Sequence, residues 1–221
     1  MAGHVFDYSG WRPDPASLKA AGVAGVCRYL ATPAQSWKVI GKGEYDRLLA
    51  AGMPVTLNWE EAAGSWRSGY PLGRSHGGYA RVLARQLGHP DERPIIQSID
   101  TAVTPAELAT AVDYQRGFND GGGCGPQGIY GTKYVIDACF SQGLVRVGWQ
   151  AAARGWYGNG PDCANAALIQ RTSTKSYPQF PPTSYDENTV HQGDWGQHPA
   201  PDERLTGADA ILIAREIWGL P

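Results

Sequence analysis

The sequence predicts a single irregular (β/α)8 barrel of the TIM type that spans residues 1–221 and lacks one or two outer helices. Short apolar runs alternate with amphipathic helical stretches, which implies parallel strands joined by right-handed crossovers. Eight such runs, with a last helix at the chain end, favour a closed barrel. An open doubly wound sheet is the alternative, because residues 156–165 and 173–188 contain no long helix. No linker or internal repeat divides the chain, so we expect one domain.

Apolar periodicity and turn residues set the expected elements. The strands are expected at residues 4–8, 24–30, 54–60, 93–100, 127–131, 144–150, 167–171 and 189–194. Six helices are expected around them. Their signals are Asp14-Pro15 before the first, Gly52 and Gly88 after the second and third, the capping box Thr104–Glu107 before the fourth, Gly143 after the fifth and a start near Thr206 for the last.

Composition excludes several classes of protein. The formal net charge is −2, and no run of Lys or Arg is present, so we expect neither a nucleic-acid partner nor an anionic membrane surface. No apolar stretch approaches the ~18–20 residues of a membrane span. The first ten residues, MAGHVFDYSG, lack the basic and apolar regions of a signal peptide.

Cysteine and histidine spacing predicts neither a metal site nor a cofactor. The four cysteines form no CxxC pair, and the five histidines form no HExxH motif. Cys27 and Cys139 fall on apolar faces and are expected to be buried thiols. Cys124 and Cys163 lie in Gly-rich loops, where they are either reduced or paired with each other.

Carboxylates follow several of the expected strands. Asp7 ends the first strand, Glu60 and Glu61 the third, Asp100 the fourth and Asp194 the eighth. In a parallel barrel these ends form the mouth, where the working groups lie. Two carboxyl groups at one site are what glycoside hydrolysis needs. The alternative is that these residues cap helices or remain solvated.

Aromatic and amide side chains accompany the same strand ends. Trp and Tyr can stack on the C–H faces of sugar rings, and Gln can bond sugar hydroxyls. The candidate substrate-binding residues are therefore Tyr29, Trp59, Trp149, Gln150, Gln170 and Trp195. Packing between the barrel and its helices, or the satisfaction of backbone groups, is the alternative for each of them.

Several short motifs resemble one known family. They are Phe6-Asp7-Tyr8, Arg28-Tyr29-Leu30 with the later Lys38, Asn58-Trp59-Glu60, Ile99-Asp100, Gly128-Ile129-Tyr130-Gly131, Ile169-Gln170 and Gly193-Asp194. Together they resemble the glycoside-hydrolase-like barrels of the domain of unknown function 1906, relatives of the family 25 lysozymes. The resemblance implies an irregular barrel and a bacterial cell-wall glycan, such as peptidoglycan, as substrate. Because a signal peptide is missing, the chain looks most like the phage branch of that family.

Two functions are predicted for such a barrel. The first is hydrolysis of a cell-wall glycosidic bond, with Glu60 as acid/base, Asp100 as partner carboxylate, and Asp7 and Asp194 tuning them. The second is a catalytically inactive structural or receptor-binding component of a phage tail, with other tail proteins as partners. It is motivated by residues 98–102, which carry one carboxylate where family 25 lysozymes carry two. The expected location is a phage virion, or the host cytoplasm before lysis.

The segment 173–188 is long for a loop inside a compact barrel. Its aromatic and proline residues, Tyr177, Pro178, Phe180, Pro181, Pro182 and Tyr185, suggest either a wall of the glycan cleft or a partner contact. The alternative is that they cover the outside of the barrel in place of a helix.

Overall fold

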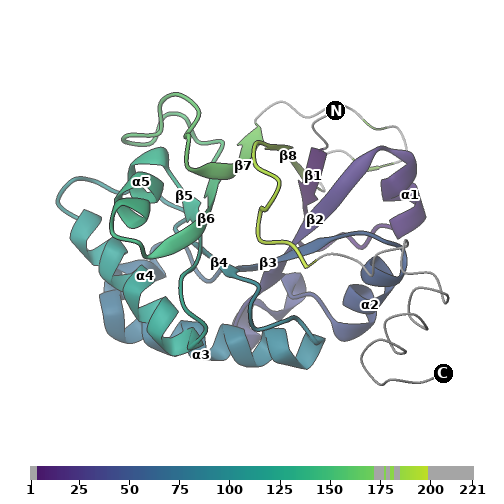
Figure 1. Ribbon diagram of the computed structural model, residues 1–221, viewed down its shortest axis with the longest axis horizontal. Helices are drawn as coiled ribbons and strands as arrows, with labels where there is room; N and C mark the ends of the chain where they lie inside the picture. The colour runs from purple at the N-terminus through teal and green to yellow at the C-terminus, as the bar shows by residue number, and fades with distance from the viewer. Residues whose placement is uncertain (1–3, 172–176, 178–179, 182–184, 199–221) are drawn as a thin grey trace, which may run out of the picture.

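The chain forms a closed eight-stranded barrel (Figure 1). The computed structural model describes residues 4–171, 177, 180–181 and 185–198. Neighbouring strands follow the order of the sequence, so the open-sheet alternative is wrong. The strands are β1 (His4–Asp7), β2 (Val23–Leu30), β3 (Val55–Trp59), β4 (Ile95–Ser98), β5 (Gln127–Gly131), β6 (Val145–Gln150), β7 (Ala166–Arg171) and β8 (Asp186–Val190).

The direction of β8 departs from the prediction of eight parallel strands. Strands β1 to β7 run parallel to one another, whereas β8 pairs antiparallel with both β7 and β1. A parallel return needs a long crossover, usually through a helix, and no helix is described between β7 and β8. The strand also begins before the expected range 189–194. Its first residue, Asp186, therefore lies at the barrel end where the other seven strands finish.

Five α-helices follow the first five strands: α1 (Pro15–Ala20), α2 (Lys42–Ala50), α3 (Gly69–Leu87), α4 (Leu108–Gly122) and α5 (Lys133–Ser141). The expected cap of α1 is confirmed, because Asp14 Oδ2 accepts from the Ser17 amide at 3.0 Å. Ahead of α4, the Thr104 amide donates to Glu107 Oε2 at 3.0 Å, which is one bond of the expected capping box. The expected cap itself is wrong, because α4 begins only at Leu108, with Glu107 as its N-cap and no side-chain cap bond. No helix follows β6 or β7 in the described part of the chain. The helix expected near Thr206 lies outside the described residues.

Glycines bring α3 and α4 into direct backbone contact. An added Cβ at Gly77 would stand 2.0 Å from the Phe118 carbonyl oxygen, and one at Gly121 would stand 1.9 Å from that of Arg74. Gly73 and Gly117 are equally close to the opposite backbone. The two helices thus form one closely packed pair on the outside of the barrel (Figure 1).

Aromatic side chains from the segment after β7 cover the outside of the barrel at β1. Tyr185 stacks on Phe6 with ring centroids 4.4 Å apart, and Tyr177 and Phe180 meet the same ring edge-on. Phe180 also contacts Trp11 at 4.9 Å. For these three residues the covering role is confirmed, whereas the rest of the predicted loop lies largely outside the described residues.

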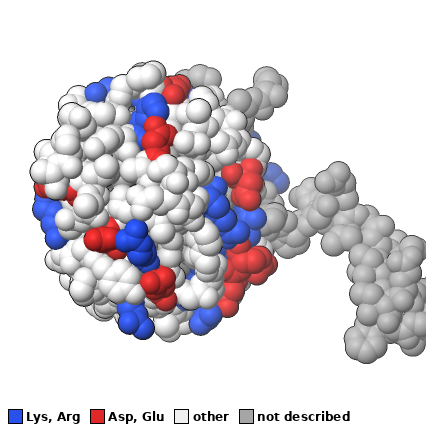
Figure 2. Space-filling view, turned by 60° about the vertical axis from the view of Figure 1, so that its left-hand side comes forward, with Lys and Arg blue, Asp and Glu red and all other residues white. Residues whose placement is uncertain are grey.

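The cysteines are unpaired, and one face of the molecule carries mixed surface charges. All four cysteines are free, so pairing of Cys124 with Cys163 is wrong, while Cys27 and Cys139 are buried as expected. The face of the molecule that carries α3 and α4 shows acidic and basic side chains interspersed rather than a patch of one sign (Figure 2). None of the described helices is long and apolar enough to cross a membrane.

Candidate functional site

A polar cavity of about 320 Å³ opens at the barrel end where β1 to β7 finish. Seven strands, β2 to β8, contribute to its lining, either directly or through a residue one or two positions after the strand. Three of the lining side chains are carboxylates. The lining residues are Tyr29, Asn58, Glu60, Asp100, Tyr130, Trp149, Gln170 and Asp186. The structure thus brings five predicted site residues to one place: Glu60, Asp100, Tyr29, Trp149 and Gln170.

Asp7 lies beneath this cavity as a fourth carboxylate. It is 2% exposed and accepts hydrogen bonds from Tyr29 Oη at 2.7 Å and from Asn188 Nδ2 at 2.8 Å. Burial, and then the negative charge of Asp186, raises the pKa of Asp7 to about 7. Burial also holds the pKa of Tyr29 well above its usual value, so this phenol remains a hydrogen-bond donor at neutral pH.

Glu60 combines burial with a cationic partner. It follows β3, and Lys38 Nζ donates to its Oε1 at 2.8 Å. Lys38 belongs to a short 3-10 helix (Pro33–Lys38) after β2 and is itself only 5% exposed. Burial raises the pKa of Glu60, Lys38 opposes this rise, and the charge of Asp100 adds to it.

Asp100 and Asp186 face the same cavity from β4 and β8. Burial raises the pKa of both, and the charge of Asp100 raises that of Asp186 further. Gln170 Nε2 donates to Asp186 Oδ2 at 3.3 Å, while Tyr130 Oη donates to Gln170 Oε1 at 2.9 Å. A chain of hydrogen bonds therefore holds the carboxylate of the reversed strand in the mouth.

Trp149 supplies the indole that lines the cavity. Its Nε1 donates to Asn188 Oδ1 at 2.6 Å, and Asn188 also bonds Asp7. One amide on β8 therefore fixes both a tryptophan and the deepest carboxylate.

Two predicted residues lie at the opposite end of the barrel. Asp194 comes after the reversed β8 and pairs with Arg93, which precedes β4, at 2.6 Å. Trp195 is 5% exposed and packs so closely on Gly25 near the start of β2 that a Cβ there would lie 2.5 Å from its ring. The prediction that Asp194 and Trp195 line the mouth is wrong, because it assumed that β8 is parallel.

Three further candidates have structural contacts instead. Trp59 is 1% exposed and packs beneath α3, with its ring 5.1 Å from that of His76. Gln150 is fully buried, donates to Asn159 Oδ1 at 2.8 Å and accepts from the Cys163 amide at 2.8 Å. Glu61 accepts from the Thr32 hydroxyl at 3.1 Å. For Trp59 and Gln150 the alternative of packing or backbone satisfaction is correct, and Glu61 bonds Thr32 instead of lining the cavity.

Asp186, Asn58 and Tyr130 line the cavity without having been predicted. Asn58 alternates with Trp59 along β3, so the inward choice between them depends on the register of the strand. On β5, whether Tyr130 faces inward likewise depends on the register of the strand. No signal in the sequence around Asp186 showed that a strand would begin, rather than end, at the mouth.

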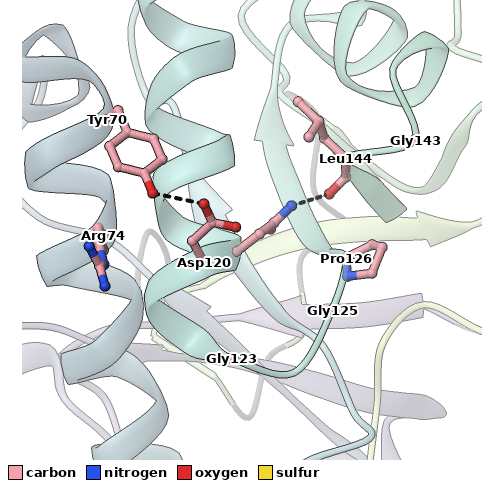
Figure 3. Close-up of a pocket in the computed structure, with 9 residues that line it drawn as sticks. Tyr70, Arg74, Asp120, Gly123, Gly125, Pro126, Gly143 and Leu144 are labelled. Atoms are coloured by element: carbon pink, nitrogen blue, oxygen red, sulfur yellow. Dashed lines mark hydrogen bonds between the residues drawn. The ribbon is translucent and has the colours of Figure 1, made fainter.

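A larger open hollow of about 620 Å³ lies beside α3 and α4, at the loops that precede β5 and β6 (Figure 3). Three of its polar side chains already have hydrogen-bond partners within its lining. Tyr70 Oη donates to Asp120 Oδ2 at 2.8 Å, and Asn119 Nδ2 donates to the Leu144 carbonyl oxygen at 2.6 Å. Its lining contains a single carboxylate, so it lacks the paired groups of the mouth cavity. Nowhere in the described ranges do three His, Cys, Asp or Glu side chains gather as metal ligands.

A barrel of this topology with a carboxylate-lined mouth defines a glycoside-hydrolase-like barrel protein. Residues 16–206 match the family described as the Rv2525c-like, glycoside hydrolase-like domain, and the chain belongs to this family. No match is found among curated protein sequences.

Solved structures share the fold. The Tat-secreted protein Rv2525c of Mycobacterium tuberculosis, in complex with L-tartrate, superposes with a TM-score of 0.76 at 24% identity, covering 89% of this chain and 99% of that one. The catalytic domain of the endolysin ply40 from Listeria monocytogenes bacteriophage P40 gives 0.58 at 18% identity, with 86% and 94% covered. The spore cortex lytic enzyme SleM of Clostridium perfringens gives 0.59 at 12% identity, with 86% and 67% covered. These neighbours include secreted, phage and spore proteins, so the phage origin remains a prediction.

Proposed function

We propose that the mouth cavity binds a bacterial cell-wall glycan and hydrolyses one of its glycosidic bonds. The supporting observation is that carboxylates from four strands, Asp7, Glu60, Asp100 and Asp186, meet at one polar cavity where burial raises the pKa of each. A carboxyl group that keeps its proton near neutral pH can protonate a leaving oxygen, and an ionised neighbour can stabilise the opposite charge.

In this proposal Glu60 is the acid/base and Asp100 its partner. The Glu60 carboxyl donates its proton to the glycosidic oxygen as the bond from that oxygen to the anomeric carbon breaks. The Asp100 carboxylate stabilises the positive charge that develops on the sugar. Water then adds its hydroxyl group to the anomeric carbon and returns a proton to Glu60. Asp7 and Asp186 add two further carboxyl groups to the site, and the charge of Asp186 raises the pKa of Asp7.

The substrate class rests on relatives. Neighbours of the same fold are described as an endolysin and a spore cortex lytic enzyme, and these act on bacterial walls. The site of action is therefore proposed to be the bacterial cell wall, reached either by secretion or from a phage particle.

A second function, glycan binding without cleavage, has its own support. On β4 the residue two positions before Asp100 is Ser98, whose Oγ donates to Asn58 Oδ1 at 2.9 Å. If Asp100 matches the second carboxylate of the lysozyme pattern, this hydroxyl stands where the first would be, and if it matches the first, Ala102 stands where the second would be. Such a barrel would be a wall-binding component, in a phage tail or another assembly.

The release of reducing ends from purified cell walls separates the two functions. Wild type should release them, and Glu60→Gln and Asp100→Asn should each lower the rate by at least ~100-fold, because a positioned acid or base contributes about 10²–10⁴-fold. Binding of wild type to the walls with no release supports the second function. Equal release by all three proteins contradicts the assignment of Glu60 and Asp100.

A further inference from the structure

Two exposed aromatic side chains stand on loops at the barrel mouth. Trp37 is 62% exposed and Tyr157 is 52% exposed, and they are two of only four large apolar side chains exposed in the described part of the chain. The other two, Tyr79 and Val82, lie on the outer helix α3. An exposed indole or phenol is a flat apolar face with a polar edge, the chemistry that stacks on a sugar ring.

Trp37 is fixed against the site. It belongs to the 3-10 helix after β2, and its neighbour Lys38 bonds Glu60 in the cavity. Its ring faces Gly10 of the loop after β1, where an added Cβ would be 3.9 Å from it. The indole Nε1 donates to Gln35 Oε1 at 3.3 Å, and Arg12 Nη2 donates to the Trp37 carbonyl oxygen at 3.4 Å. Backbone and ring are both positioned, yet most of the residue stays exposed to solvent.

Tyr157 is held in the same way in the loop between β6 and β7. Its ring meets that of Tyr134, near the start of α5, at 5.2 Å between centroids. The buried Asn159 braces this loop by donating to the carbonyl oxygens of Ala151 and Ala153 at 2.9 and 3.0 Å. Both rings are therefore already ordered in the free protein, and this lowers the side-chain entropy lost when a ligand binds.

The two loops lie on opposite sides of the mouth. In a closed barrel ordered β1 to β8, β2 and β6 are separated by three strands in either direction. Both strands are among the parallel seven, so the loops that follow them rise at the cavity end. The two loops therefore stand across the cavity from each other, on sides that are three strands apart.

We propose that Trp37 and Tyr157 are sugar-stacking subsites at the two rims, so that the ligand is a single extended polysaccharide strand laid across the mouth. This inference rests on the proposed function and adds to it the length and path of the ligand. A disaccharide would fill the cavity alone, whereas a long strand would also contact both rims. Trp37 and Tyr157 therefore favour the binding of long polysaccharide strands without contacting the glycosidic bond that is cleaved.

The test compares wild type with Trp37→Ala, Tyr157→Ala and the control Tyr79→Ala, an exposed aromatic residue on α3. Binding of a disaccharide and of a long soluble oligosaccharide, both prepared from purified cell walls, is measured by calorimetric titration. Every protein in the comparison also carries Glu60→Gln, so that the ligand is not cleaved during the measurement. Each rim variant should bind the long ligand about tenfold more weakly, the equivalent of one aromatic contact, and the disaccharide as wild type does. Trp37→Phe and Tyr157→Phe should retain most of the affinity, and Tyr79→Ala all of it.

The outcomes distinguish the two proposals. If the rim variants bind the long ligand as tightly as Tyr79→Ala does, Trp37 and Tyr157 are not subsites. The proposed function is not affected by that result. Equal losses for the long ligand and the disaccharide also overturn the subsites, because the residues would then act on the cavity itself. If wild type binds neither ligand, the proposed function fails and the subsites fail with it.

Discussion

The contact between α3 and α4 allows a stability prediction with an internal control. Gly77 and Gly78 are adjacent in α3, but they face different surroundings. A Cβ on Gly77 would stand 2.0 Å from the Phe118 carbonyl oxygen, whereas a Cβ on Gly78 would be 3.5 Å from that of Gly121, an ordinary contact. Gly77→Ala and Gly78→Ala therefore add the same methyl group to the same helix with opposite consequences.

The magnitudes follow from these distances. Alanine in a helix is favoured over glycine by about 1 kcal/mol, and Gly78→Ala should gain up to that amount. At Gly77 the helices must separate by roughly 1 Å, and a gap of that size forfeits about a quarter to a half of each dispersion contact that it opens. Overpacking costs about 1–3 kcal/mol, and we expect the upper end because backbone cannot rotate away. The net loss is about 2 kcal/mol, or roughly 4–8 °C in Tm for a chain of this size.

Thermal unfolding followed by circular dichroism measures both variants. Gly77→Ala should melt several degrees below wild type, and Gly78→Ala at or slightly above it. If Gly77→Ala melts together with Gly78→Ala, the two helices are not in backbone contact and the packing described for them is refuted.

Three further predictions concern single side chains. Because the pKa of Asp7 is about 7 against an ordinary value of ~3.9, the folded state holds this proton more tightly than the unfolded chain. Wild type should therefore lose stability as pH rises from about 4 to 7, and Asp7→Asn should flatten that slope in urea midpoints; parallel slopes would contradict the burial. Lys38→Met should raise the pKa of Glu60 in a carbon-detected NMR titration, because the opposing cation is gone, and an unchanged pKa would show that the ion pair has no such effect. Trp195→Ala should cost about 3–5 kcal/mol of stability as a buried cavity opens, while glycan binding stays unchanged; weaker binding would place Trp195 in the site after all.

Periodicity was sufficient for the barrel because each strand and helix buries one face locally. Asp14 capped its helix as expected, since capping depends on residues three apart. Thr104 and Glu107 bond each other but do not cap α4, which begins at Leu108. The strand ends of β1, β3 and β4 then located Asp7, Glu60 and Asp100 without any tertiary information.

The direction of β8 could not be read in the same way. A strand has the same alternating pattern in either direction, and direction depends on how the preceding segment returns across the barrel. Because β8 is reversed, Asp186 rather than Asp194 lies at the mouth, and Trp195 lies at the opposite end of the barrel. The predicted side-chain directions of Trp59 and Gln150 were wrong for a related reason. Near a strand end, facing inward or outward is a matter of one residue of register.

The most direct test of the carboxylate site compares Asp186, which the structure places at the mouth, with Asp194, which the sequence had predicted there. Asp186→Asn and Asp194→Asn make the same chemical change at opposite ends of the barrel. Release of reducing ends from purified bacterial cell walls is measured for wild type and both variants at neutral pH. We expect Asp186→Asn to lose most of the wild-type rate and Asp194→Asn to retain it. Full activity in Asp186→Asn, or its loss only in Asp194→Asn, would contradict the assignment of the site.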